Sequence, residues 1–163
     1  MSVQAAKVLA VAKAEVDAKY KEGKNNDTKY GKWFGLNNQP WCAMFVSWCF
    51  NQAGLGSLIK GAQTPKGFAS CQMGLDWFKK RKQVVKISEA QPGDIVFFQF
   101  DDDTPADHVG IVVSNHPVHK EMVTYEGNTA ADGSGSQFNG DGAYKKKRPY
   151  SKIMAVARPK YTA

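Results

Sequence analysis

One stretch decides the fold of this 163-residue chain: Pro40-Trp41-Cys42-Ala43-Met44-Phe45-Val46-Ser47-Trp48-Cys49-Phe50. It is apolar nearly all round and is stopped by Gly54, so it predicts a helix that is buried on every side. Cys42 stands at the start of this helix. A thiol there meets unpaired backbone N–H groups and the positive end of the helix dipole, and both favour the reactive thiolate. Alternatively, Cys42 is a small core residue, as free cysteines usually are.

Two further helices are expected on either side of this segment. Residues 2–20 carry apolar side chains at helical spacing, with Ser2 as a candidate N-cap. A Thr-Pro pair opens the stretch 64–82 and predicts a third helix there. Residues 22–40 are rich in Gly and Asn and predict a long ordered loop. Long loops in compact domains are often functional.

The second half of the chain shows the pattern of strands. After Gln91-Pro92-Gly93 we expect strands at residues 94–100, 108–114, 122–126 and 153–158. Helices first and strands second indicate an α+β domain with antiparallel strands. Residues 127–142, rich in Gly, Ser, Asn and Asp, are expected to form a mobile loop near the functional residues.

His108 opens the second predicted strand, and its partner strand lies across a short turn. If this hairpin is centred near Val118, Asn128 lies opposite His108, and Glu126 lies on the same face. The imidazole then has an amide and a carboxylate within reach. A cysteine hydrolase needs such a group, because its histidine transfers protons and must be held in one tautomer. A one-residue slip of the register would destroy the arrangement, and the alternative is a strand histidine bound to backbone.

Charge and hydropathy limit the classes of partner. The chain has 22 Lys and Arg against 15 Asp and Glu, a formal net charge of +7, which favours nucleic acid, an anionic membrane or a teichoic-acid-bearing wall. The run KKKR at 145–148 has no nucleic-acid module beside it, so it predicts a solvated basic edge. We expect no nucleic-acid partner. The sequence shows no signal peptide and no segment long enough to insert into a membrane, which predicts folding in a cytoplasm.

The number and spacing of the cysteines do not predict a disulfide framework. The sequence holds Cys42, Cys49 and Cys71. An odd number without a CxxC pair leaves at least one thiol free. Cys49, two helical turns after Cys42, and Cys71, on the apolar stripe of the third helix, are expected in the core.

Four motifs in order carry a resemblance to a known family: PWCAMFVSW (40–48), PGDIVFF (92–98), DHVGIVV (107–113) and YEGNT (125–129). Together they resemble a CHAP domain, a cysteine, histidine-dependent amidohydrolase/peptidase of the papain-like superfamily that is common in phage endolysins. The likeness spans residues 22–159. It implies that Cys42 is the nucleophile, His108 the general base, and Glu126 and Asn128 the orienting groups. Glu126 is favoured as the main one, because a carboxylate stabilises the imidazolium better than an amide.

The resemblance also implies the architecture and the substrate. It predicts an α+β, papain-like CHAP fold, with N-terminal helices packed on a small antiparallel sheet, as a single catalytic domain over residues 1–163. We expect a monomer without a wall-binding domain. The implied substrate is bacterial peptidoglycan, cleaved at the N-acetylmuramoyl-L-alanine amide or at a peptide bond of the stem or cross-bridge.

The implied setting is a phage endolysin, held in the host cytoplasm until lysis and then acting on the cell wall. Two other functions remain open. One is a non-catalytic module that binds cell wall or nucleic acid. The other is a bacterial toxin or wall-remodelling enzyme on the same scaffold.

No metal or other cofactor is expected. Some relatives carry a carboxylate-rich calcium loop just before the nucleophile, but residues 33–41 contain no Asp or Glu. The acidic run 101–103 is predicted to be a solvated loop. His116 and His119 flank Pro117 in the hairpin turn, where surface placement is expected, because nothing completes a zinc site.

Three aromatic residues near the nucleophile are candidates for substrate binding: Trp33, Phe34 and Trp41. Their rings could line a groove for glycan or stem peptide. Packing within the core is the equal alternative.

Overall fold

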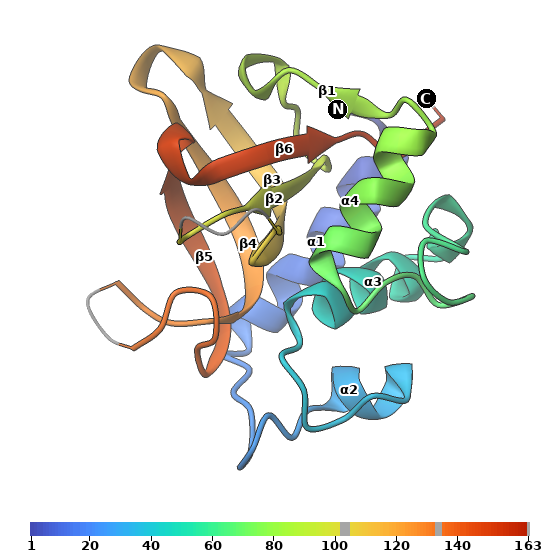
Figure 1. Cartoon of the computed structure of the whole chain (residues 1–163), viewed down its shortest axis with the longest axis vertical. Helices are drawn as coiled ribbons and strands as arrows, with labels where there is room; N and C mark the ends of the chain where they lie inside the picture. The colour runs from blue at the N-terminus through green and yellow to red at the C-terminus, as the bar shows by residue number, and fades with distance from the viewer. Residues whose placement is uncertain (102–104, 133–134, 163) are drawn as a thin grey trace.

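A computed structural model describes residues 1–101, 105–132 and 135–162, and Figure 1 shows helices packed against one curved sheet. The helices are α1 (Val3–Asp17), α2 (Lys29–Phe34), α3 (Cys42–Gln52) and α4 (Cys71–Lys80). The strands are β1 (Val84–Val85), β2 (Ile95–Phe98), β3 (His108–His116), β4 (Glu121–Thr129), β5 (Gly142–Pro149) and β6 (Ile153–Ala157). Short 3-10 turns are η1 (Gly56–Leu58), η2 (Ile87–Glu89), η3 (Pro117–His119) and η4 (Tyr150–Lys152). The α+β expectation is confirmed.

The strands form one six-stranded sheet in the order β1-β6-β2-β3-β4-β5 within the described residues, and each neighbouring pair is antiparallel. β3 and β4 form the central hairpin, and β5 follows β4 as the next strand. The β3–β4 register pairs Ile111 with Tyr125 and Val112 with Thr124, which is the register predicted from a hairpin centred near Val118. A bulge beyond Val112 shifts the pairing by one residue toward the turn.

One face of the sheet packs on the helices. α3 is the central helix of this layer: it contacts β3, β4, α1 and α2, and almost all of its residues are buried, as its all-round apolar sequence predicted. The sheet contributes alternate residues to this core, among them Ile95, Phe97, Val109 and Ile111.

The opposite face of the sheet carries a smaller apolar cluster, which includes Val96, Phe98, Val112, Met122 and Val156. Because side chains alternate along a strand, this face also receives His108, Thr124 and Glu126. His108 and Glu126 therefore extend from this face, at the end of the hairpin that approaches the start of α3.

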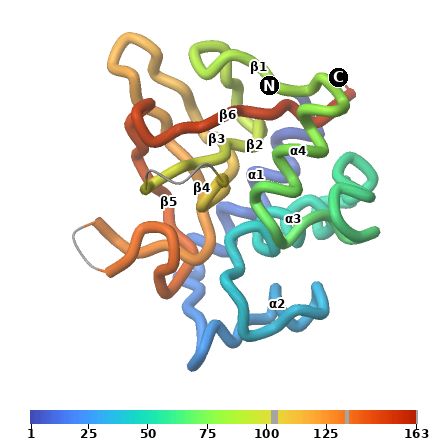
Figure 2. The backbone as a smooth tube through the Cα atoms, viewed as in Figure 1, coloured from blue at the N-terminus to red at the C-terminus, as the bar shows by residue number. Residues whose placement is uncertain are grey.

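The two ends of the chain lie together. Figure 2 shows the start of α1 beside the C-terminal segment, and the backbone N–H of Thr162 donates to Oε1 of Gln4 at 2.8 Å. The hydroxyl of Tyr161 donates to the carbonyl of Gly93 at 2.6 Å. These contacts fasten the C-terminal segment to α1 and to the start of β2.

The helical predictions need two corrections. The predicted loop 22–40 contains α2, which Thr28 caps by accepting a hydrogen bond from the N–H of Gly31 at 2.9 Å. The predicted helix over 64–82 begins only at Cys71, where Ser70 supplies the cap. The Thr-Pro pair at 64–65 opens a tight turn instead, because Gly67 takes a φ of +127° that a helix cannot accommodate. Ser2 caps α1 as predicted.

The strand predictions miss β1 and β5. β5 holds the whole run KKKR at 145–148. The side chains of the run alternate between exposed Lys145 and Lys147 and buried Lys146 and Arg148. The prediction of a solvated basic edge is therefore wrong for two of the four residues. The predicted loop 127–142 is also shorter, since β4 continues to Thr129. Asp102 and Asp103 of the acidic run lie outside the described residues.

Candidate active site

Cys42 is the first residue of α3, and the sequence around it fixes its position. The preceding residue, Trp41, is fully buried; its ring stacks on Tyr30 at 5.2 Å and its indole N–H donates to Glu22 at 3.0 Å. No side chain caps the start of α3. Cys42 is 4% exposed, and as the first residue of α3 it lies beside the free N–H groups of the first turn.

His108 is the first residue of β3 and is fully buried. Its Nε2 lies 2.7 Å from Oε1 of Glu126. The centre of its ring lies 5.7 Å from the ring centre of Phe98 and 5.8 Å from that of Phe100. Its Nδ1 is buried and has no hydrogen-bond partner among the described residues. One ring nitrogen is thus committed to the carboxylate, and the other remains available for proton transfer.

The carboxylate of Glu126 is the centre of a buried polar network. Besides His108, it accepts hydrogen bonds from Nε and Nη2 of Arg148, at 2.9 and 2.5 Å, and from the hydroxyl of Thr124 at 2.5 Å. Burial alone would raise the pKa of Glu126, but Arg148 and His108 outweigh it and lower the pKa to about 2. Glu126 is therefore ionised at neutral pH.

Two glycines make room for this network. A Cβ at Gly110 would lie 2.7 Å from Cγ of Glu126, so the missing side chain lets Glu126 fold across β3 toward His108. A Cβ at Gly127 would lie 2.6 Å from the ring of Trp41 and 2.7 Å from Phe45. The second glycine allows β4 to approach α3 closely, which brings the strand and the start of the Cys42 helix together.

The charges of Cys42 and His108 depend on each other. The pKa of Cys42 is lowered well below its ordinary value by the neighbouring Cys71 thiol and by His108, against the effect of burial. Burial also opposes the charge on His108, but the carboxylate of Glu126 and the sulfur of Cys42 raise its pKa to about 9. The site therefore favours a thiolate and an imidazolium as a buried ion pair.

Asn128 lies in the same strand, but its side chain makes no hydrogen bond to His108. Its backbone has a φ of +55° within an irregular stretch of the β4–β5 pairing. Its side-chain Nδ2 donates to Oδ1 of Asn139 at 3.4 Å. Its own Oδ1 is buried without a hydrogen-bond partner among the described residues. The structure therefore brings Glu126 to His108 and leaves Asn128 with an unused acceptor beside the site.

Two residues of the site escaped the sequence reasoning. The sequence predicts Arg148 at a solvated edge, yet its guanidinium donates two hydrogen bonds to Glu126. The Cζ atom of Arg148 also lies 4.9 Å from the ring centre of Phe100. Cys71 was assigned to the core; it is buried there, but its Sγ also lies 3.5 Å from Sγ of Cys42. A strand over this run places alternate residues on opposite faces, but four basic residues in a row do not indicate which face is buried. The sequence also holds no signal for the cysteine pair.

The three candidate substrate-binding aromatics lie in or against the core. Trp41 is fully buried and Phe34 is 7% exposed, so packing accounts for both. Trp33 is partly buried, and Nζ of Lys66 lies 5.3 Å from its ring centre. A groove of about 270 Å³ nearby is lined instead by Leu36, Gln39, Pro40, Met44, Gln63, Ala69 and Ser70. Its lining includes Pro40, two residues before Cys42, and Ser70, the residue before Cys71.

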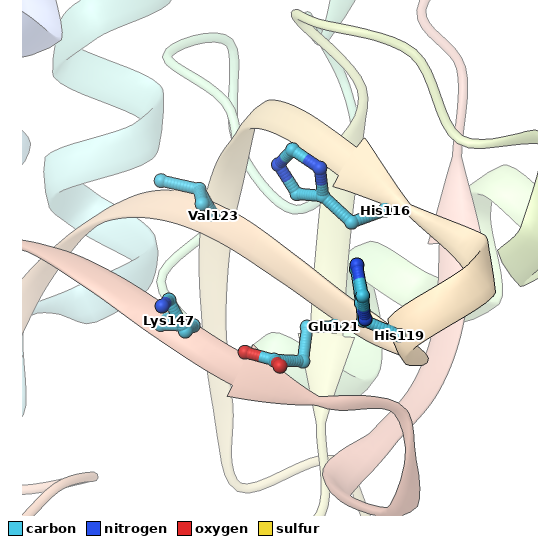
Figure 3. Close-up of a pocket in the computed structure, with 5 residues that line it drawn as sticks. All are labelled: His116, His119, Glu121, Val123 and Lys147. Carbon is cyan, nitrogen blue, oxygen red and sulfur yellow. The ribbon is translucent and has the colours of Figure 1, made fainter.

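A second hollow lies at the turn of the β3–β4 hairpin. Figure 3 shows its lining residues, His116, His119, Glu121, Val123 and Lys147. His116 contacts the hydroxyl of Ser114 at 2.9 Å. Across residues 1–101, 105–132 and 135–162, no group of three or more His, Cys, Asp or Glu side chains is arranged to hold a metal ion. In the same residues, no helix is long and apolar enough to cross a bilayer.

Comparison with known proteins adds one match. No curated protein resembles the chain significantly. A family model described as the CHAP domain matches residues 34–128, which is more than half of the chain and includes Cys42, His108, Glu126 and Asn128. The six-stranded antiparallel sheet with its helices is consistent with the papain-like fold of that family. The chain therefore belongs to the CHAP domain family, which indicates a cysteine- and histidine-dependent hydrolase with peptidoglycan amidase or peptidase activity in general.

Proposed function

We propose that this protein cleaves an amide bond of bacterial peptidoglycan, with Cys42 as nucleophile, His108 as the proton-transferring residue and Glu126 as the group that orients it. The observation that carries this proposal is the buried contact between His108 and Glu126, 2.7 Å long, which leaves Nδ1 of the imidazole without a partner. A histidine held in this way has one nitrogen for its orienter and one for the reaction.

The proposed reaction has two halves. In the first, the Cys42 thiolate adds to the amide carbonyl carbon, and the carbonyl oxygen becomes an oxyanion. The imidazolium of His108 then gives its proton to the leaving amine, the C–N bond breaks, and a thioester remains on Cys42. In the second half, His108 takes a proton from water, and the resulting hydroxide adds to the thioester. The C–S bond then breaks and releases the carboxylic acid product and the thiolate.

Electrostatic stabilisation in this scheme comes from two places. The uncapped N–H groups of the first turn of α3 are positioned to donate to the oxyanion formed at Cys42. On the other side, the Glu126 carboxylate stabilises the imidazolium, and Arg148 keeps that carboxylate ionised and in place. Arg148 thus acts as a positioning residue through Glu126. We assign Asn128 a lesser role, in which its unused Oδ1 accepts a hydrogen bond from substrate.

The groove near Cys42 is the proposed seat of the substrate. Its lining mixes apolar side chains with two glutamines and a serine, which suits a peptide stem with amide groups. The net charge of +7 favours approach to an anionic wall. These features support a bond in or next to the stem peptide. Both the N-acetylmuramoyl-L-alanine amide and a peptide bond of the stem or cross-bridge fit this description.

The decisive experiment is digestion of purified peptidoglycan followed by mass spectrometry of the products. An amidase frees the amino terminus of L-alanine, whereas an endopeptidase frees amino termini within the stem or the cross-bridge. The matched control is Cys42→Ala, which should release no product. Absence of any product with the wild-type protein would reject the enzyme and favour a non-catalytic wall-binding module.

We also propose the biological setting of a phage endolysin that is made in the host cytoplasm and reaches the wall at lysis. The support is the resemblance of the four motifs to endolysin CHAP domains and the basic surface charge. Lysis of bacteria by the protein added from outside, compared with lysis after co-expression of a membrane-permeabilising holin, tests this setting separately from the chemistry.

A further inference from the structure

The nucleophile candidate has a second thiol beside it. Cys71 is the first residue of α4, and its Sγ lies 3.5 Å from Sγ of Cys42, within hydrogen-bond distance for sulfur. All three cysteines of the chain are free thiols, and both members of this pair are buried, with exposures of 4% for Cys42 and 8% for Cys71. Two helix N-termini, those of α3 and α4, therefore place two thiols at the same point.

The surroundings decide which sulfur keeps the proton. Cys42 faces Cys71 from α4 and the imidazole of His108 from β3, with Glu126 behind the imidazole, and this set favours its thiolate. For Cys71 the Cys42 sulfur, burial and the carboxylate of Asp107 all raise the pKa well above its ordinary value. If Cys42 is the thiolate that the proposed reaction requires, only Cys71 carries a proton to donate across the 3.5 Å between the two sulfurs.

We propose that Cys71 is a positioning residue that donates an S–H hydrogen bond to the Cys42 thiolate and thereby sets the reactivity of the nucleophile. This inference deepens the proposed function, because it rests on Cys42 being the nucleophile. Hydrogen bonds to a charged acceptor are stronger than those between neutral groups. Ala69 and Ser70, which help to line the proposed substrate groove, directly precede Cys71 in the chain.

The hydrogen bond has two opposite effects on reactivity. It increases the fraction of thiolate at low pH, but it also withdraws negative charge from the sulfur, so each thiolate is a weaker nucleophile. Its removal should therefore slow the reaction of Cys42 at low pH and accelerate it at high pH. A residue with a purely structural role would not produce such a crossover.

The test is the rate of alkylation of Cys42 by iodoacetamide as a function of pH, followed by mass spectrometry of the Cys42 peptide in the presence of a phosphine reductant. For Cys71→Ala we expect the pH midpoint to rise by about one unit, which lowers the thiolate fraction on the acid side about tenfold. Because each remaining thiolate is more reactive, the rate on the acid side should fall by about threefold. The rate on the alkaline plateau should increase by about threefold. Cys71→Ser keeps a donor and should restore the wild-type profile.

Cys49→Ala is the matched control. Cys49 lies on the same helix as Cys42 and is fully buried, and its pKa is raised by burial and not by Cys42. Its replacement should leave the alkylation profile unchanged. If Cys71→Ala is unstable in thermal unfolding, Cys71→Val replaces it, because valine fills the space of the sulfur without supplying a donor.

Alkylation of Cys42 needs no peptidoglycan. The role of Cys71 and the proposed hydrolysis of peptidoglycan can therefore be rejected independently of each other. Identical profiles for the wild type and the donor-free Cys71 variant would overturn the role of Cys71, even if the protein hydrolyses peptidoglycan. A parallel loss of rate at every pH, with no restoration by Cys71→Ser, would also overturn it in favour of packing. Conversely, a crossover without any hydrolysis of peptidoglycan would support the hydrogen bond and reject the hydrolase.

Discussion

The β3–β4 hairpin has a polar cluster at each end. At the open end of the hairpin, His108 and Glu126 contact each other and Glu126 binds Arg148 of β5. At the turn, His116 and Glu121 line a hollow together with Lys147, which also belongs to β5 (Figure 3). Both places thus hold a histidine, a glutamate and a basic residue. At the open end all three are buried and joined by hydrogen bonds of 2.5 to 2.9 Å. At the turn the side chains are mostly exposed to solvent.

The comparison shows that the same residue types interact very differently when they are buried and when they are exposed to solvent. In low-dielectric surroundings, charged groups interact strongly and cannot exchange their partners for water. The carboxylate of Glu126 therefore raises the pKa of His108 to about 9 despite burial. Water screens the corresponding charges at the turn. Matched substitutions at the two ends can test this difference.

The largest effect is expected for the histidines. His108→Ala should lower peptidoglycan hydrolysis by at least about a thousandfold, because proton transfer to the leaving amine is lost. Cys42→Ser should be equally severe, since a hydroxyl is a far poorer nucleophile. His116→Ala should stay within about twofold of wild type. Release of labelled wall fragments measures all three. Equal loss in both histidine variants would end the contrast between the two regions.

A smaller effect is expected for the glutamates. Glu126→Gln should lower turnover by about a hundredfold, because an amide stabilises the imidazolium less well than a carboxylate. Glu121→Gln should be neutral. Asn128→Ala should be milder than Glu126→Gln, because its side chain makes no hydrogen bond to His108. Steady-state kinetics on soluble wall fragments would rank the variants. If Asn128→Ala proved the more damaging, the assignment of the main orienter would have to be reversed.

The basic residues of β5 offer a third matched pair. Arg148→Met removes the partner of a buried carboxylate and should cost about 3 kcal/mol of unfolding free energy, together with about tenfold in turnover. Lys147→Met, one residue away and exposed, should change neither quantity by much. Urea unfolding and kinetics give the two numbers. A stable and fully active Arg148→Met variant would show that Glu126 needs no positioning.

The pH profile sharpens the comparison further. Because the pKa of His108 is raised to about 9, the imidazolium persists to that pH, and activity should fall as the pH rises through it. In Glu126→Gln the carboxylate that favours the imidazolium is gone, so this alkaline limb should move to lower pH. The acid limb follows the lowered pKa of Cys42 and should lie below the ordinary thiol range. An alkaline limb that stays in place in Glu126→Gln would exclude this origin of the shift.

The smallest effect is expected for metal removal. Activity should survive EDTA, because residues 33–41 carry no carboxylate and the proposed chemistry uses none of the hollow at the hairpin turn. The measurement is hydrolysis after dialysis against chelator, with and without added calcium. Loss of activity that calcium alone restores would reveal a calcium site and would indicate that an acidic segment of the chain binds the ion.

Much of the site follows from the sequence because the signals are local. An all-round apolar segment makes α3 a buried helix, and its first residue is Cys42. A short turn between two alternating strands determines the register that brings Glu126 to His108. Both inferences use periodicity over fewer than about twenty residues, where the chain geometry leaves few alternatives.

The tertiary structure alone decided the remaining contacts. No local pattern says that Arg148 points inward, because a polar edge strand can present either face to solvent until a buried carboxylate selects one. The positive φ of Asn128, which interrupts the ideal strand, depends on how β5 pairs with β4. The contact between Cys42 and Cys71 joins residues 29 positions apart at the ends of two helices. Such contacts depend on how whole elements pack, and packing is set by the complete core and not by any single segment.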